Sequence, residues 1–242
     1  MILLLSGEGP TDIGVCLKPI GECEGADFKP GAMAWVVDKL VEPIWGYSPL
    51  STKSCVFVSE HSLGHYCRSG RVGTILPGKK RPAETGYFFK NARGLAQMAK
   101  ARAAQDKCNV GAVLFRDSDG TVASQRSLWH DQVKSIEQGF AAETFSFGVA
   151  MVPKPKSEAW LLCALQPVPY QNCARYEDLS GNDASPKSAK DALKNTLMTK
   201  KKEYENVPEM IEQGTIDPQR IQMPSFDRFR RRLQEVATKM RS

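Results

Sequence analysis

The chain opens with Met1-Ile-Leu-Leu-Leu-Ser-Gly-Glu-Gly-Pro-Thr-Asp12, and this stretch decides the fold class. A continuous apolar run that stops at Gly and Pro is typical of a buried strand rather than a helix. Strands buried on both faces belong to parallel sheets, whose ligands bind just beyond the carboxyl ends. Glu8 and Asp12 follow the strand directly, so they lie where an α/β protein places its chemistry.

Strand and helix patterns alternate over the first 165 residues. The sequence predicts further strands over Ser54–Ser59, Asn109–Phe115 and Thr144–Val152, and helices over Ala32–Ile44, Thr85–Gln105, residues 122–138 and from Ser157, whose side chain is the expected N-cap. Residues 14–30 and 60–82 are rich in Gly with little periodicity, which predicts surface loops. The alternation indicates an α/β fold with a doubly wound, mostly parallel sheet of about four strands flanked by helices.

The composition changes after residue 165, where Pro- and Asn-rich segments precede basic helical patterns. Helices are predicted over Ser185–Leu197, Lys201–Asn206 and Ser225–Lys239, the first with Ser185 as N-cap and Pro186 behind it. We therefore expect an α/β domain over residues 1–165 and a mainly helical C-terminal extension over residues 166–242.

Composition narrows the class of protein. The 242 residues are 41% hydrophobic and 25% charged, which is ordinary for a globular protein, and no apolar run reaches the ~18–20 residues of a membrane span. The seven cysteines are irregularly spaced and odd in number, which predicts free thiols in a reducing cytoplasm rather than a disulfide framework. Residues 184–242 hold 13 Lys and Arg against 8 Asp and Glu, which suits a polyanionic partner or simply a well-solvated surface.

Three of the four predicted strands end in carboxylates. Glu8 and Asp12 follow the first, Asp117 and Asp119 the third, and Glu158 the fourth. Because parallel strands end on one edge of the sheet, these side chains are expected to converge. Uncompensated carboxylates repel one another, and oxygen ligands without histidine select Mg²⁺ or Mn²⁺. The ordered set predicts a metal site, although Asp-Ser-Asp-Gly taken alone is typical of an ordinary turn.

The motifs Ser-Gly-Glu8-Gly-Pro-Thr-Asp12 and Phe-Arg-Asp117-Ser-Asp119-Gly resemble those of the Toprim fold. Together with Lys154-Pro-Lys156-Ser-Glu158-Ala-Trp they are most similar to the OLD family and related stand-alone Toprim nucleases of bacterial defence systems. This resemblance covers residues 1–165, with a weaker likeness at Pro224-Ser-Phe226. It implies a Toprim-like, Rossmann-like fold and an anti-phage effector that works with an ATPase partner of the ABC or SMC type.

The resemblance also implies a catalytic site for Mg²⁺- or Mn²⁺-dependent hydrolysis of nucleic-acid phosphodiesters. Glu8, Asp117 and Asp119 would hold one ion, and Asp12 and Glu158 would serve a second or position its water ligands. Two ions can activate the attacking water and stabilise the leaving oxygen. Lys154 or Lys156 would neutralise charge on the phosphate. Two lysines on a solvated loop explain the same residues equally well.

Basic residues around this edge are candidates for contact with DNA or RNA: Arg116, Lys79, Lys80, Arg81, Arg230 and Arg231. An ordinary loop and a solvated helix face are the alternatives. Two other functions stay open for the whole chain. One is a regulatory or binding subunit of an ATPase complex without catalysis, and the other is a metal-dependent phosphatase acting on small phosphoesters.

Overall fold

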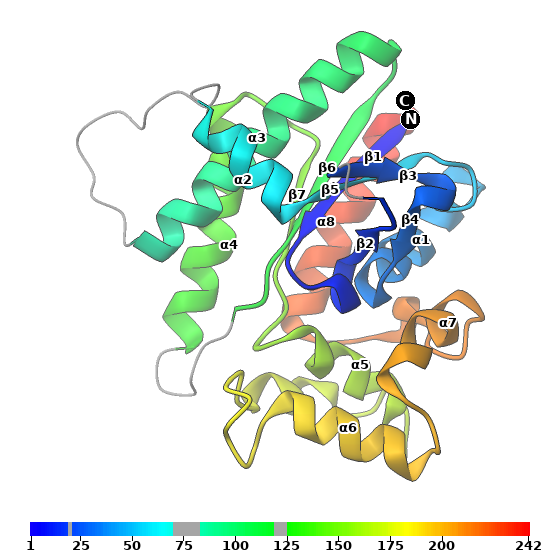
Figure 1. The fold of residues 1–242 in the computed structure, drawn as a ribbon. Coiled ribbons are helices and arrows are strands. Elements are labelled where there is room, and N and C mark those ends of the chain that lie inside the picture. Colours follow the sequence, from blue (N-terminus) through cyan, green and yellow to red (C-terminus); the bar gives the residue numbers. More distant parts are fainter. Residues whose placement is uncertain (19–20, 70–82, 119–124) are drawn as a thin grey trace.

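A five-stranded sheet forms the centre of the computed structural model, which describes residues 1–18, 21–69, 83–118 and 125–242 (Figure 1). The strand order is β3-β5-β1-β6-β7, made by Glu22–Glu24, Cys55–Ser59, Ile2–Gly7, Val110–Phe115 and Gly148–Met151. Strands β5, β1, β6 and β7 run parallel, whereas the edge strand β3 is antiparallel to β5. The predicted α/β class with a mostly parallel sheet is confirmed.

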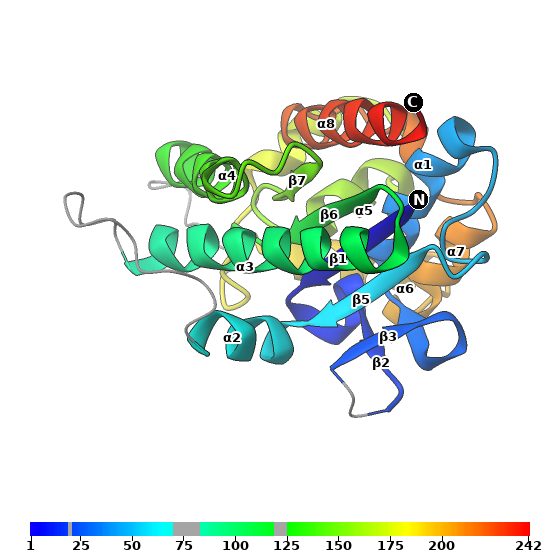
Figure 2. The ribbon, with the colours of Figure 1, turned by 90° about the horizontal axis from the view of Figure 1, so that it is seen from above.

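Helices cover both faces of the sheet because the strand side chains alternate between them. Leu3 and Leu5 face one core together with α1 (Ala32–Trp45) and α8 (Pro224–Arg241). Leu4 faces a second core with α2 (Glu60–Arg68), α3 (Ala83–Asp106) and α4 (Gln125–Ala142). Figure 2 shows α8 and α3 on opposite sides of β6, with the two chain ends at the same end of the sheet. The full burial explains why β1 reads as an unbroken apolar run.

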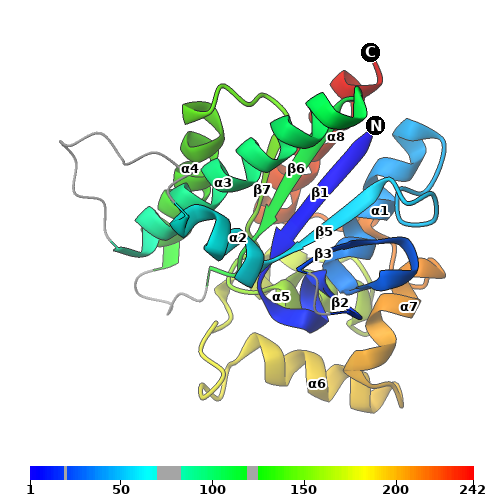
Figure 3. The ribbon, with the colours of Figure 1, turned by 45° about the horizontal axis from the view of Figure 1, so that its top comes forward.

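The remaining helices lie beyond the carboxyl ends of the strands (Figures 1 and 3). These are α5 (Ser157–Leu165), α6 (Ala189–Thr199) and α7 (Val207–Glu212). The chain then returns along the sheet as α8, so residues 166–242 contribute to the same core as β1 and α1. The C-terminal segment is thereby placed both at the edge where the predicted site lies and in the centre of the fold.

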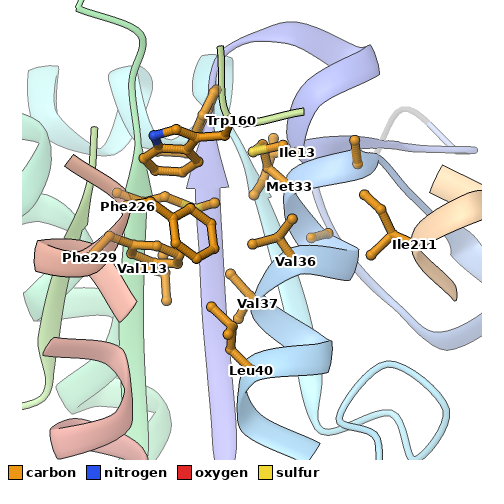
Figure 4. Close-up of a cluster of buried hydrophobic side chains, with 14 of the residues drawn as sticks. Ile13, Met33, Val36, Val37, Leu40, Val113, Trp160, Ile211, Phe226 and Phe229 are labelled. Atoms are coloured by element: carbon orange, nitrogen blue, oxygen red, sulfur yellow. The ribbon is translucent and has the colours of Figure 1, made fainter. Parts of the chain in front are cut away.

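The buried indole of Trp160 fixes the position of α5. It packs against both Phe226 and Phe229 of α8, with ring centroids 4.9 and 5.6 Å away, and its Nε1–H donates to Ser225 Oγ over 2.8 Å. Figure 4 shows this aromatic group beside Val113 and the apolar face of α1. Burial of an aromatic residue of this size stabilises the fold by ~3–5 kcal/mol relative to alanine. Since Glu158 is two residues before Trp160, the core also holds the start of α5 at the strand ends.

Several sequence predictions are wrong in detail. The described residues of 14–18 and 21–30, expected as a loop, include β3 and an antiparallel ribbon of β2 (Gly14–Cys16) and β4 (Phe28–Pro30), so the described sheet has five strands rather than about four. The expected loop after residue 60 begins with α2, whose N-cap Ser59 accepts from Ser62 N–H. These elements are too short or too polar for a periodic pattern, and neighbouring strands stabilise them instead.

The sequence also predicts the wrong starting residue for the helices after residue 156. Lys156, not Ser157, is the N-cap residue of α5, because the Ser157 hydroxyl bonds elsewhere. Ser188 rather than Ser185 caps α6, where its side chain accepts from Asp191 N–H. The predicted helix over residues 201–206 is a 3-10 turn at Tyr204–Asn206 that leads into α7.

Four of the seven cysteines form disulfides, contrary to the prediction of free thiols. Cys16 bonds Cys23, and Cys163 bonds Cys173, with Cα–Cα distances of 5.7 and 5.0 Å. Each pair is separated by only 7 or 10 positions, so a local turn brings the thiols together. Irregular spacing along the sequence does not reveal such turns. None of the helices in the described ranges combines the length and the apolarity needed to cross a bilayer.

Candidate functional site

The ends of β1 and β6 form the switch point of the sheet. From β1 the chain runs through α1 to β5, and from β6 it runs through α4 to β7 on the other side of β1. The two loops therefore leave the sheet in opposite directions, and α/β proteins bind ligands at such a switch point. Glu8 follows β1 and Asp117 follows β6 in adjacent register, with Gly7 opposite Phe115. The sheet topology places these two carboxylates at the switch point.

A single π-helical turn, Gly9–Ile13, brings Asp12 back toward Glu8. Glu8 is the residue before this turn, and Pro10 at its start suits the fixed backbone angle of a first turn. Gly9 has a φ of +79°, and a Cβ at this position would lie 2.6 Å from Asp12 Oδ2. Only glycine fits both conditions without strain. The Gly-Pro sequence therefore folds the second carboxylate over the end of β1.

Three hydrogen bonds connect the acidic residues after β1 and β6 with one another and with Ser157 after β7. Asp117 N–H donates to Glu8 Oε1 over 2.8 Å, and Ser157 N–H donates to Asp117 Oδ1 over 3.0 Å. The Ser157 hydroxyl donates to Asp12 Oδ1 over 2.5 Å. Glu158, which is 8% exposed, follows Ser157 at the start of α5. The structure thus brings Glu8, Asp12, Asp117 and Glu158 together, although they span 150 positions of the sequence.

The electrostatics of this cluster favour protonation of Asp12 and Glu158. Burial, together with the nearby charges of Glu158 and Glu8, raises the pKa of Asp12 to about 6, against the lowering effects of the Ser157 hydrogen bond and the Lys156 charge. Burial also raises the pKa of Glu158, while Lys156 acts in the opposite direction. Buried carboxylates that repel one another are stabilised by a cation. The cluster is therefore a place where a bound cation would be favoured.

The two candidate lysines have different neighbours. Lys156 Nζ lies 3.0 Å from Asp183 Oδ1, and its charge lowers the pKa values of Asp12 and Glu158. Lys154 Nζ instead lies 3.8 Å from the buried carboxylate of Glu177, whose Oε1 accepts from Ser225 N–H. The structure places Lys156 in the field of the carboxylates and pairs Lys154 with the C-terminal segment.

Tyr204 is a residue at this site that sequence reasoning missed. Its hydroxyl lies near enough to the Ser157 side chain to interact with it, and burial followed by the charges of Asp12 and Glu158 raises its pKa strongly. The phenol therefore stays protonated and can donate a hydrogen bond at neutral pH. It comes from the turn between α6 and α7, and no sequence motif relates that turn to the strand ends.

The basic candidates are mostly engaged in the fold. Arg116 is 1% exposed, and its Nη1–H donates to Phe115 O over 2.9 Å while its guanidinium lies 5.7 Å from the ring centroid of Tyr87. Arg230 donates to two backbone carbonyls and pairs with Asp227, whereas Arg231 is exposed on α8. Arg116 thus lies next to the acidic site but inside the protein.

Some candidates lie outside the described residues. These are Asp119 of the predicted metal site and the loop residues Lys79, Lys80 and Arg81. Within the ranges that the structure describes, no three His, Cys, Asp or Glu side chains are grouped closely enough to hold a metal ion. The oxygen donors of these carboxylates are of the type that binds Mg²⁺ or Mn²⁺. In the described residues, however, they are not close enough together to coordinate an ion.

Comparisons with models of known protein families, with curated proteins and with solved structures found no match to this chain.

Proposed function

We propose that this protein is a Mg²⁺- or Mn²⁺-dependent nuclease of the Toprim type that hydrolyses nucleic-acid phosphodiesters. One observation carries the proposal: at the switch point of the sheet, hydrogen bonds connect the acidic residues that follow β1 and β6 with one another and with Ser157, which follows β7 and precedes Glu158. The stability of a fold gains little from burying like charges, so a cluster of this kind favours a role in chemistry. The Toprim resemblance supplies the reaction type.

The ion would be held by carboxylate oxygens of Glu8, Asp12, Asp117 and Glu158, with Asp119 as a further ligand. The raised pKa of Asp12, caused by burial and by like charges, supports the fit of a divalent cation. When bound, such an ion polarises phosphate oxygens and lowers the pKa of a coordinated water. Two ions, as the resemblance implies, would divide these tasks.

The neighbouring side chains would bind and orient the substrate. Lys156 would neutralise a bound phosphate, because its charge acts on both Asp12 and Glu158. Tyr204 would donate its one hydroxyl proton to a phosphate oxygen of the bound substrate, because its phenol stays protonated. Ser157 would hold Asp12 in place through its hydroxyl.

The test combines metal binding with cleavage. Titration calorimetry with MgCl₂ and MnCl₂ is compared for the native protein, Glu8→Gln and Asp117→Asn. Both variants keep the oxygen that accepts the observed hydrogen bond and remove only the charge. Asp131→Asn, on the exposed face of α4, is the matched control. The same proteins are then assayed on single-stranded and duplex DNA and RNA, and on a chromogenic phosphoester.

We expect ion binding and nucleic-acid cleavage in the native protein and in Asp131→Asn, and loss of both in the two site variants. Cleavage that persists in Asp117→Asn, or native protein that is folded but neither binds an ion nor cleaves, would refute the proposal. Hydrolysis of the phosphoester alone would assign a phosphatase instead. The ATPase partner, the anti-phage role and the cytoplasmic location stay predictions from the sequence.

A further inference from the structure

A basic groove runs along one face of α6. Lys190, Lys194, Leu197 and Met198 recur at helical spacing, and with Lys202 and Tyr204 of the following turn they line a cavity of about 310 Å³. The three lysines are exposed, and Met198 keeps 64% of its surface exposed. We call this cavity the α6 groove. It combines an apolar wall with a cationic rim.

The α6 groove adjoins the carboxylate cluster at two points. Tyr204 lines the groove and also contacts the Ser157 side chain of the cluster. Lys190 lines the groove and pairs with Asp183 over 3.0 Å, and the other carboxylate oxygen of Asp183 pairs with Lys156 over 3.0 Å. The charge of Asp183 raises the pKa of Glu158, and the charge of Lys190 lowers it. A chain bound in the groove would therefore be led to the acidic site.

Three arginines of α8, by contrast, are engaged in contacts within the fold. Arg228 pairs with Glu137, and Arg232 donates to the backbone carbonyls of residues 146 and 148. Arg230 is held by Asp227 and two carbonyls. The lysines Lys194 and Lys202 take no ion pair in the described part of the chain. The cationic surface that points to a polyanion is thus on α6.

We propose that the α6 groove binds an unpaired nucleotide of a single-stranded nucleic acid and presents the adjoining phosphodiester to the carboxylate cluster. The base would lie against Leu197, Met198 and Tyr204, since every base has a face that stacks on apolar and aromatic groups. Flanking phosphates would contact Lys194 and Lys202. This substrate class rests on the proposed nuclease function.

Size and charge both favour a single strand. The volume is at the lower end of the ~300–1,000 Å³ typical of ligand sites, which suits one nucleotide. Glu203 and Glu205 also line the groove, and their charges would repel phosphates on their side. The backbone would therefore follow the lysine rim, and a rigid duplex has no unpaired base to insert.

Binding is measured in EDTA, where no metal-dependent cleavage occurs, by fluorescence anisotropy of a labelled single strand of about 12 nucleotides. The variant Lys194→Gln/Lys202→Gln is compared with Lys134→Gln/Lys239→Gln, which removes the same charge from exposed sites on α4 and α8. We expect the groove variant to bind about 10-fold more weakly, and the slope of log affinity against log salt to fall by about 1.4, because each single-strand phosphate contact contributes about 0.7. The control should bind as the native protein does.

A second variant, Met198→Gln, should weaken binding without changing the salt slope, because it removes a base contact and no charge. Duplex of the same sequence should bind more weakly than the single strand. Equal losses in the groove and control variants, native affinity in both groove variants, or no binding of single strands by the native protein would overturn the proposal. A groove-dependent affinity in a protein that never cleaves would leave the inference standing and refute the nuclease function instead.

Discussion

Replacing Asp12 by Asn should stabilise the protein while abolishing its activity. Asp12 is partly buried, and burial together with the charges of Glu158 and Glu8 raises its pKa from 3.8 to about 6. Asn keeps an oxygen to accept the Ser157 hydroxyl and removes the buried charge. The substitution therefore relieves repulsion without leaving that donor unpaired. A gain in stability with a loss of function is expected where a site carries strain for its chemistry.

The magnitude follows from linkage between protonation and folding. The folded state binds the Asp12 proton more tightly than the unfolded chain, so stability falls as pH rises from 3.8 to about 6 and is constant above that. A tenfold difference in proton affinity is worth about 1.4 kcal/mol. The ionised carboxylate thus costs about 3 kcal/mol at pH near 7.5 and about 1 kcal/mol at pH near 4.5. Asn at position 12 should recover these amounts.

The assay is urea unfolding of the native protein and Asp12→Asn in EDTA at both pH values, followed by circular dichroism. Asp131→Asn on α4 serves as the control, because an exposed carboxylate should change stability little at either pH. Saturating Mg²⁺ should stabilise the native protein more than the variant, since ligand binding to the folded state adds to its stability. A variant less stable than the native protein at the higher pH, or a gain that does not depend on pH, would refute this reasoning.

Two further substitutions test how the site is held. Gly9→Ala should lower both cleavage and stability, because the φ of +79° at this position disfavours a side chain and the new methyl group would displace Asp12. Calorimetry with Mg²⁺ measures the ion affinity, and thermal unfolding measures the stability. An unchanged ion affinity would contradict this prediction. Cys163→Ser/Cys173→Ser should cost about 3 kcal/mol, from the chain entropy that the disulfide removes, and thiol alkylation of the denatured native protein should modify only the three remaining cysteines. Alkylation of all seven would show that neither disulfide forms.

Local patterns in the sequence determined the architecture. The apolar run at residues 2–5 and the one at 110–115 predicted buried parallel strands, because burial on both faces leaves no polar alternation. The amphipathic pattern of 32–44 predicted α1 within one residue of its observed end. Acidic residues directly after strands were placed at one edge by topology alone. Each of these properties depends on neighbours within a few positions, so it can be predicted from the sequence alone.

Only the tertiary structure decided what meets at that edge. Tyr204 reaches the carboxylates because α6 and the following turn lie beyond the strand ends, a contact across more than forty positions from Ser157. Packing likewise gave Lys156 and Lys154 different partners, Asp183 and Glu177, although their spacing in the sequence did not distinguish them. It also formed β3, whose three residues are stabilised as an edge strand by β5. Such contacts depend on how distant elements pack against Trp160 and the common core, and no local periodicity encodes that.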